Sequence, residues 1–184
     1  AFIMTDKADN QITAFYPGAM EYATKLSLEN IPTDFVVISP NNPQAMVKLS
    51  QQCQQHSIPY MLDPGMQLPT LSQGDLQEML KGATILIGND YEISLLKEKL
   101  TLDEEQILNQ VKILITTLGE KGSLVQTAGN TSPSRWALTP GRWQINAAKP
   151  TAVVDPTGAG DAFRAGFLAG FSKNLDLKIC AQMG

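Results

Sequence analysis

The sequence predicts an α/β fold in which a mostly parallel sheet is flanked by helices, and three observations support this prediction. Apolar residues make up 43% of the 184 residues and charged residues 17%, which is enough apolar material for one real core. Short runs rich in Val, Ile and Leu alternate with longer segments of helical period, as in successive βαβ units. The helical period disappears near residues 123–154, where turn residues separate short β-type segments and predict hairpins. We expect a single domain over residues 1–184.

The first expected elements are a strand at residues 1–5 and a helix at residues 19–28. Further strands are expected where a short apolar run is rich in β-branched residues and is bounded by polar or turn residues. These runs are residues 35–39, 60–62, 84–88 and 113–117. Helices are expected between them, and Pro43 fits a first helical turn because its missing N–H is not needed there. The expected helices are residues 43–55, 76–81, 92–99 and 104–110.

In the hairpin region, β-type segments are expected at residues 123–127 and 142–146, with an exposed loop at residues 128–133. A helix is expected from Gly158 toward Ser172, because its phenylalanines fall on one face. Ligands of an open parallel sheet bind beyond the carboxyl ends of the strands, so polar residues at those ends are the first candidates for a site. They are Asn41, Asn42, Asp63, Asn89, Asp90 and residues 117–122.

The charge pattern favours a small-molecule partner. There are 14 Lys and Arg against 18 Asp and Glu, a net charge of −4, and no run of like charges that would indicate nucleic-acid binding. No segment reaches the ~18 apolar residues that would span a bilayer, so we expect no membrane partner. Cys53 and Cys180 lie in expected helices without metal-type spacing, which predicts reduced thiols in a cytoplasmic protein. A homodimer is the oligomeric state that we expect.

The two ends of the chain lie inside expected elements. The chain begins within the first expected strand and stops at Gly184 within an expected helix. A strand edge and an apolar helix face at the ends would need partners. We therefore expect a fragment that is incomplete at both ends.

The strongest chemical signal is the segment DPTGAGDAF at residues 155–163. Two glycines around one alanine at a helix start let backbone N–H groups converge on an anion, such as a phosphoryl group that gains charge. Asp161 stands in the first turn, where its carboxylate could accept a proton from an attacking hydroxyl. A lone aspartate there is more often a cap that complements the helix dipole, but a cap does not need the flanking glycines. The segment is neither a Walker loop nor a dinucleotide fingerprint, since it lacks the Lys of the first and the third Gly of the second.

This segment resembles the C-terminal signature of the ribokinase-like (PfkB) carbohydrate and nucleoside kinases. The resemblance implies that Asp161 is the catalytic base and that Gly158, Ala159 and Gly160 form an anion hole. Arg164 follows one turn later, and it could reach toward the phosphate or be a solvated helix arginine.

Two more segments resemble motifs of the same family, in the expected order. The segment NDYE resembles an Asn-x-x-Glu motif, which implies that Asn89 contacts the nucleotide and that Glu92 helps to organise Mg²⁺ through water. The segment TLGEKG resembles the nucleotide-binding loop, and the implied ATP contacts are Thr117, Leu118, Gly119, Glu120, Lys121 and Gly122. Taken alone, the first is a helix cap with Glu at the capping-box position and the second is a turn. The family often also needs a monovalent cation such as K⁺.

Nearly the whole chain resembles the bacterial adenosine kinases within this family. The segments that carry this likeness are residues 11–20, 62–68, 89–92 and 161–167. The likeness implies that Phe2 and Phe15 line a purine pocket and that Gln67 contacts the nucleoside. An aromatic face suits a base, although core packing is the alternative for both phenylalanines.

This sequence departs from the subfamily at several places. Met66 stands where the subfamily tends to have a polar residue, and the loop at residues 130–142 is longer than usual. The family's N-terminal region, with an acceptor-binding Asp and much of a lid, is not in these 184 residues.

The resemblance implies an ATP-dependent phosphotransferase that acts on an alcohol group, transferring the γ-phosphoryl group to the 5′-hydroxyl of adenosine to give AMP. Two alternatives stay open. A PfkB-type sugar kinase would use the same residues on a ribose- or fructose-like acceptor. A non-catalytic nucleotide-binding fragment would keep only the fold.

Overall fold

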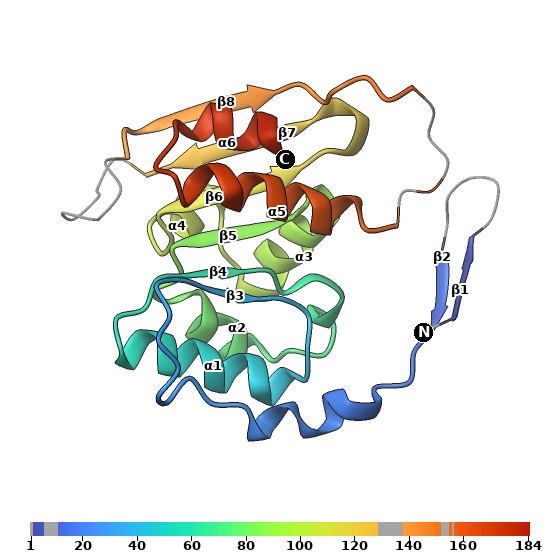
Figure 1. Ribbon diagram of the computed structural model, residues 1–184, viewed down its shortest axis with the longest axis vertical. Coiled ribbons are helices and arrows are strands. Elements are labelled where there is room, and N and C mark those ends of the chain that lie inside the picture. Colours follow the sequence, from blue (N-terminus) through green and yellow to red (C-terminus); the bar gives the residue numbers. More distant parts are fainter. Residues whose placement is uncertain (1, 6–10, 129–137, 152–154, 156) are drawn as a thin grey trace.

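The computed structural model describes residues 2–5, 11–128, 138–151, 155 and 157–184 (Figure 1). Its main sheet has six strands in the order β3-β4-β5-β6-β7-β8, and β1 and β2 form a separate two-stranded sheet. Neighbouring strands from β3 to β6 are parallel, whereas β7 and β8 are antiparallel. The strands are Phe2–Thr5, Gln11–Ala14, Val36–Ile38, Tyr60–Leu62, Ile85–Asn89, Ile113–Thr117, Ser123–Thr127 and Gly141–Ile145, for β1 to β8. The mostly parallel sheet and the hairpin after it are confirmed.

The helices lie mostly where the sequence predicts them. They are α1 (Pro43–Gln55), α2 (Gln73–Leu80), α3 (Asp90–Leu100), α4 (Glu104–Leu108), α5 (Ala159–Phe171) and α6 (Leu177–Met183). Short 3-10 helices are η1 (Gly18–Lys25), η2 (Gly65–Gln67) and η3 (Gly119–Lys121). The prediction of an ordinary helix at residues 19–28 is wrong, because only Ala23 of η1 is buried and no apolar face packs to favour an α-helix. In the described part of the chain, the helices are too short or too polar to cross a bilayer.

The main sheet is covered on both faces. Successive strand residues point to opposite sides, so Leu86 of β5 packs toward one helical layer while Ile85 and Ile87 pack toward the other. The first layer contains α1 to α3, and the second contains α5 and α6 (Figure 1). Phe167 and Phe171 of α5 stack with their ring centroids 5.9 Å apart inside the second cluster. Burial of each such side chain contributes about 1.5–3 kcal/mol, which holds α5 on the sheet.

Both cysteines lie inside these clusters. Cys53 of α1 and Cys180 of α6 are buried and free. Burial raises the pKa of the Cys53 thiol to about 11, and it raises the pKa of Cys180 as well. Both thiols are therefore held in the unreactive protonated form.

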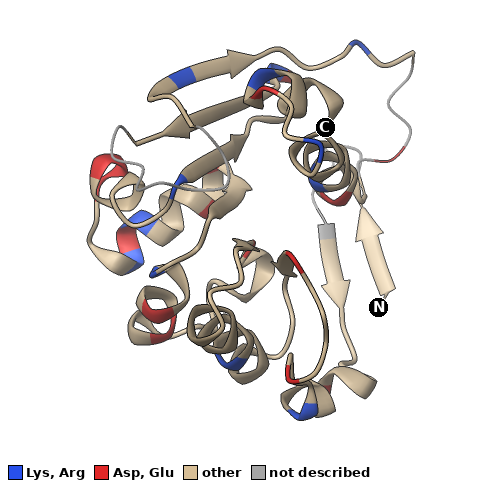
Figure 2. Cartoon of the chain, turned by 60° about the vertical axis from the view of Figure 1, so that its left-hand side comes forward, with Lys and Arg blue, Asp and Glu red and all other residues tan. Residues whose placement is uncertain are grey.

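The hairpin of β1 and β2 stands apart from the main sheet (Figure 1 and Figure 2). Its register pairs Phe2 with Ala14 and Thr5 with Gln11. Large apolar side chains on it are exposed, with 82% of Phe2 and 70% of Ile12 accessible. Two predicted loops, at residues 128–133 and 130–142, lie largely outside the described residues.

Candidate active site

The first turn of α5 faces open space. Gly158 caps the helix with a φ of 84°, a left-handed conformation that residues with a Cβ rarely adopt. A Cβ added at Gly158 or Gly160 would meet no heavy atom within 4 Å, so space lies in front of the turn. The backbone N–H groups of a first turn have no partner within the helix, and they attract negative charge. The turn therefore has the space to accommodate a small anionic group.

The entry to this turn is also ordered. The Thr157 N–H donates a hydrogen bond of 2.8 Å to Asp155 Oδ1. This bond lowers the pKa of the exposed Asp155 carboxyl and keeps it charged. The neighbouring residues 152–154 and 156 lie outside the described residues.

Asp161 is the third residue of α5, and its side chain is 73% exposed. Gly158, the N-cap residue, has no side chain that could cap the helix through a hydrogen bond. Asp161 instead forms an ion pair with Arg164, one turn further along the same helix. The position also complements the helix dipole, as the simpler interpretation requires.

A cavity of about 560 Å³, here called the hairpin cavity, lies between the β1–β2 hairpin, the carboxyl ends of the parallel strands and the first turn of α5. Phe15 and Met66 supply apolar walls. Asp63, Asn89 and Asp161 supply polar groups. A mixture of apolar walls and a few polar groups is typical of small-molecule sites.

A second cavity of about 500 Å³, here called the β8 cavity, lies between the loop after β6, the chain that leaves β8, and helices α5 and α6. Gly119 and Gly122 of the loop line it. The loop closes through a 2.8 Å hydrogen bond from the Leu118 N–H to the Gly122 carbonyl. A Cβ at Gly122 would lie 1.9 Å from the carbonyl oxygen of Ile145, so only glycine lets the loop pack against the end of β8.

The two cavities meet at one place. Thr117, Ala159 and Gly160 line both of them. Two ligands, one in each cavity, would therefore face each other at the glycine turn of α5. Asp161 lines the hairpin cavity directly beside this junction.

Asn89 and Glu92 form a reciprocal cap at the start of α3. Asn89 Oδ1 accepts a 2.8 Å hydrogen bond from the Glu92 N–H, and Glu92 Oε2 accepts one of 2.8 Å from the Asn89 N–H. Both residues also line the hairpin cavity. The capping interpretation is confirmed, and the cap holds both side chains beside the cavity.

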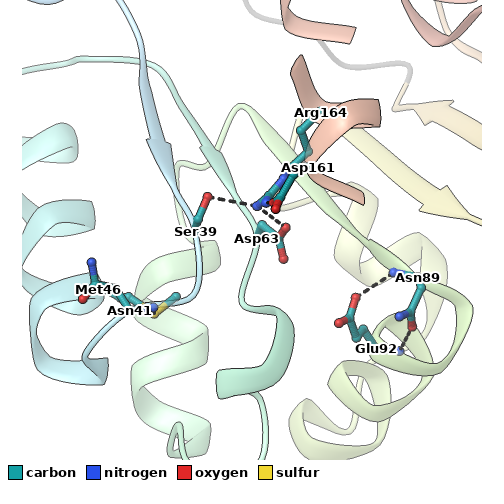
Figure 3. A network of polar contacts seen from close by, with 8 residues as sticks. All are labelled: Ser39, Asn41, Met46, Asp63, Asn89, Glu92, Asp161 and Arg164. Atoms are coloured by element: carbon teal, nitrogen blue, oxygen red, sulfur yellow. Dashed lines mark hydrogen bonds and ion pairs between the residues drawn. The ribbon is translucent and has the colours of Figure 1, made fainter. Parts of the chain in front are cut away.

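Arg164 joins three elements in a polar network (Figure 3). One guanidinium nitrogen, NH1, donates to Ser39 Oγ at 2.9 Å and forms an ion pair with Asp63, while NH2 pairs with Asp161. Burial raises the pKa of the Asp63 carboxyl to about 6, because loss of water outweighs the positive charge of Arg164, and the charge of Glu92 acts in the same direction as burial. The interpretation of Arg164 as a solvated arginine is wrong, since only 13% of its side chain is exposed.

Several predicted residues lie away from the cavities. Phe2 does not line either cavity, and its neighbour Ile3 lines the hairpin cavity instead. Gln67 does not line them, and its Oε1 accepts a 2.8 Å hydrogen bond from Thr70 Oγ1. Three members of the predicted ATP loop are also absent from both linings, namely Leu118, Glu120 and Lys121.

Ser39, and the pairing of Asp63 with Arg164, are the parts of the site that the sequence did not predict. Asp63 follows β4 directly, so the sequence predicted that it lies at the strand ends, but not that it forms an ion pair with Arg164. Ser39 follows β3 and carried no signal of its own.

Known proteins are similar to this chain in sequence and in fold. The profile of the pfkB family carbohydrate kinases matches residues 1–184. A nucleoside kinase of Methanocaldococcus jannaschii is 33% identical over 184 residues, which is 100% of this chain and 57% of that protein. A ribokinase of Bacillus subtilis is 30% identical over 184 residues, which is 99% of this chain and 54% of that protein. The chain thus spans about half the length of the curated relatives it matches.

Solved structures of a nucleoside kinase are also similar to this chain. The nucleoside kinase of Burkholderia thailandensis in complex with inosine has a TM-score of 0.89 and 34% identity, covering 98% of this chain and 57% of that one. The same kinase with ADP and inosine has a TM-score of 0.88 and 34% identity, covering 98% of this chain and 53% of that one. The predicted ribokinase-like fold is therefore confirmed.

Proposed function

Because the chain belongs to the pfkB family of carbohydrate kinases, we propose that the whole protein transfers the γ-phosphoryl group of ATP to the 5′-hydroxyl of a nucleoside, with adenosine as an acceptor. One observation carries this proposal. Two cavities share Thr117, Ala159 and Gly160, so a donor in one and an acceptor in the other would meet at a turn suited to anions.

The hairpin cavity suits a nucleoside better than a free sugar. Phe15, Met66 and Ile3 give it apolar walls that a base can cover and that a sugar alone would leave in contact with water. Asp63 and Asn89 offer polar partners for hydroxyl groups. The inosine complex of the similar Burkholderia thailandensis kinase supports this choice of substrate class.

The β8 cavity suits the nucleotide. Gly119 and Gly122 bring backbone close to the space, and Ala159 and Gly160 of the first turn of α5 also line it. The complex of the same relative with ADP and inosine supports a nucleotide next to a nucleoside. Backbone N–H groups of the first turn would stabilise the charge that develops on the transferred group.

The chemistry that we propose is a direct displacement. The oxygen of the acceptor hydroxyl forms a bond to the γ-phosphorus while the bond between that phosphorus and the bridging oxygen of ADP breaks. Asp161 takes the hydroxyl proton, and its place beside the junction of the cavities suits that role. Phosphoryl transfer depends mainly on positioning and electrostatics, which the turn and the two cavities provide.

Mg²⁺ fits this arrangement as an ion held largely by phosphates and water. Among the described residues, no group of three or more His, Cys, Asp and Glu side chains could hold a metal. Mg²⁺ at phosphate sites usually needs only one or two carboxylates, and Glu92 at the edge of the hairpin cavity is our candidate. The ion would neutralise phosphate charge during transfer.

The runner-up function is a sugar kinase, which the similarity to a Bacillus subtilis ribokinase supports. Assays of the whole protein with Mg-ATP and a panel of adenosine, inosine, cytidine, ribose and fructose separate the two. We expect phosphate transfer to nucleosides with a higher kcat/KM than to either sugar. A preference for ribose or fructose would favour the runner-up, and ATP binding without transfer to any acceptor would favour a nucleotide-binding protein.

The oligomeric state, the location and the cation requirement remain predictions. We propose a homodimer in the cytoplasm. Light scattering of the purified whole protein tests the dimer, and assays with and without K⁺ test the cation requirement.

A further inference from the structure

We propose that Arg164 is a positioning residue, which fixes the carboxylate of Asp161 from the ends of strands β3 and β4. The inference rests on the proposed function, in which Asp161 accepts a proton, but it concerns a residue with no assigned role. Arg164 has a partner after β3, a partner after β4 and a partner on its own helix (Figure 3).

The two guanidinium nitrogens divide these contacts. NH1 donates to Ser39 Oγ at 2.9 Å and pairs with Asp63, whereas NH2 pairs with Asp161. A guanidinium is planar and its donors are fixed relative to one another. Once NH1 is held by Ser39 and Asp63, the direction of NH2 is also set.

The exposure of the side chains shows which of the two ion pairs of Arg164 is harder to break. The side chains of Arg164 and Asp63 are 13% and 15% exposed, whereas that of Asp161 is 73% exposed. Breaking a buried ion pair leaves an uncompensated charge in poor contact with water, so the pair of Arg164 and Asp63 is the more costly of the two to break. Arg164 therefore stays with Asp63, and Asp161 adjusts to Arg164 rather than the reverse.

The consequence for Asp161 is a restricted carboxylate. Arg164 occupies Oδ1, and within the described part of the chain no hydrogen bond reaches Oδ2. Oδ2 is then the oxygen left for the acceptor hydroxyl. An exposed aspartate without such a contact would sample several rotamers, and small misplacements of a reacting group can lower a rate by up to about 10²-fold.

The same contacts argue against Arg164 as a phosphate ligand. Its single positive charge already faces the carboxylates of Asp63 and Asp161. Its side chain is anchored at the strand ends rather than free at the helix surface. We therefore expect its loss to affect turnover more than nucleotide binding.

The test compares variants of the whole protein. Arg164→Lys keeps the positive charge but loses the planar guanidinium with its separate NH1 and NH2 donors. Arg164→Met combined with Asp63→Asn removes the buried ion pair without leaving a buried charge. Arg142→Met is the matched control, since Arg142 is a surface arginine on β8 whose side chain is 63% exposed. The readouts are kcat, the KM values for ATP and adenosine, and the melting temperature.

We expect kcat to fall about tenfold in Arg164→Lys and about 10²-fold in the paired variant, with KM for ATP within about twofold. Arg142→Met should leave all three kinetic constants unchanged. A kcat for the Arg164 variants equal to that of the control overturns the positioning role. A large rise in KM for ATP with unchanged kcat overturns it as well, because it would make Arg164 a nucleotide ligand.

A second readout does not depend on activity. Asp161→Asn should lower the melting temperature more in the wild-type background than in the paired variant, where the ion pair is already absent. Equal losses in the two backgrounds overturn the inference whatever the activity. Unequal losses in a protein without kinase activity support the contact and reject the proposed function instead.

Discussion

Asn89 and Thr117 are direct partners in the register between β5 and β6. Both residues end their strands and both line the hairpin cavity, although they are far apart in the sequence. Asn89 then caps α3, and Thr117 opens the glycine loop of the β8 cavity. Parallel pairing therefore brings two of the predicted motifs to one edge of the sheet, opposite the first turn of α5.

Phe15 and Phe2 should behave differently when each is replaced by alanine. Phe15 lines the hairpin cavity, whereas Phe2 does not. Phe15→Ala should weaken adenosine binding by about 1–3 kcal/mol, the range for one lost base stack, which raises KM about 5- to 150-fold. Phe2→Ala is the control, with KM for adenosine within about twofold. Steady-state kinetics check both, and equal effects would contradict the placement of the base.

Gly160→Ala should separate catalysis from folding. Gly160 is the second residue of α5, where an added methyl meets no atom within 4 Å but enters space shared by the two cavities. Gly74 is the second residue of α2, and its added Cβ would have ordinary contact with Ser72 Oγ at 3.9 Å. Both Gly→Ala changes should stabilise the protein by up to about 1 kcal/mol, since alanine favours helix.

Only Gly160→Ala should lower kcat/KM, by about 10- to 100-fold, because the methyl occupies the place of the anion. Melting temperatures and kinetics of the two variants test this. Full activity of Gly160→Ala would show that no reacting group approaches the turn.

Lys99 should contribute to stability by holding residues 68–71, which follow the cavity-lining residues Gly65 and Met66 in the sequence. Its ammonium donates to the carbonyls of Leu68 and Leu71 at 2.6 Å each, and to that of Pro69 at 3.2 Å. Lys99→Met should lower the free energy of unfolding by about 1–3 kcal/mol, the range for hydrogen bonds to a charged group. Lys97→Met on the same helix is the control, with a change below about 0.5 kcal/mol. Urea unfolding measures both, and similar values would show that these carbonyl contacts contribute little.

Asp63 should make stability depend on pH in a specific direction. Burial raises the pKa of Asp63 from 3.8 to about 6 in the folded protein. The folded state therefore binds its proton more tightly than the unfolded state, so this stabilisation is complete below about pH 4 and is lost as pH rises through about 6.

The measurement compares the wild type with Asp63→Asn, which cannot titrate. The free energy of unfolding of the wild type, relative to that of Asp63→Asn, should fall by up to about 3 kcal/mol between about pH 4 and about pH 7. A difference that stays constant or rises over this range would contradict the raised pKa.

The sequence predicted those parts of the fold that have a local cause. Strands β4 and β6 have the predicted bounds, because short apolar runs end at polar residues. Helix α1 also has its predicted bounds. Asn42, the residue before Pro43, caps the helix because its side chain accepts hydrogen bonds from the N–H groups of Gln44 and Ala45. The glycine turn before Asp161 could also be predicted, because its glycines and the helix that follows are adjacent in the sequence.

Contacts between distant segments could not be predicted in this way. Arg164 and Asp63 are 101 residues apart, and nothing in the sequence around either residue indicates that they form an ion pair. Phe2 was expected in the purine pocket, but successive strand residues face opposite ways, and Ile3 is the neighbour that lines the hairpin cavity. The register places Phe2, Met4, Ile12 and Ala14 on one face of the hairpin, whereas Ile3 and Thr13, which line the cavity, lie on the other. The apolar pattern alone therefore did not indicate which face meets the cavity.

The proton-accepting role of Asp161 is the central claim, and Asp161→Asn in the whole protein tests it most directly. Asparagine keeps the size of the side chain but cannot accept the hydroxyl proton. We predict that kcat falls by about 10²- to 10⁴-fold or more, while the affinity for ATP measured by calorimetry changes little. A near-normal kcat with a lowered melting temperature would contradict the account, because it would show that Asp161 only stabilises the start of α5.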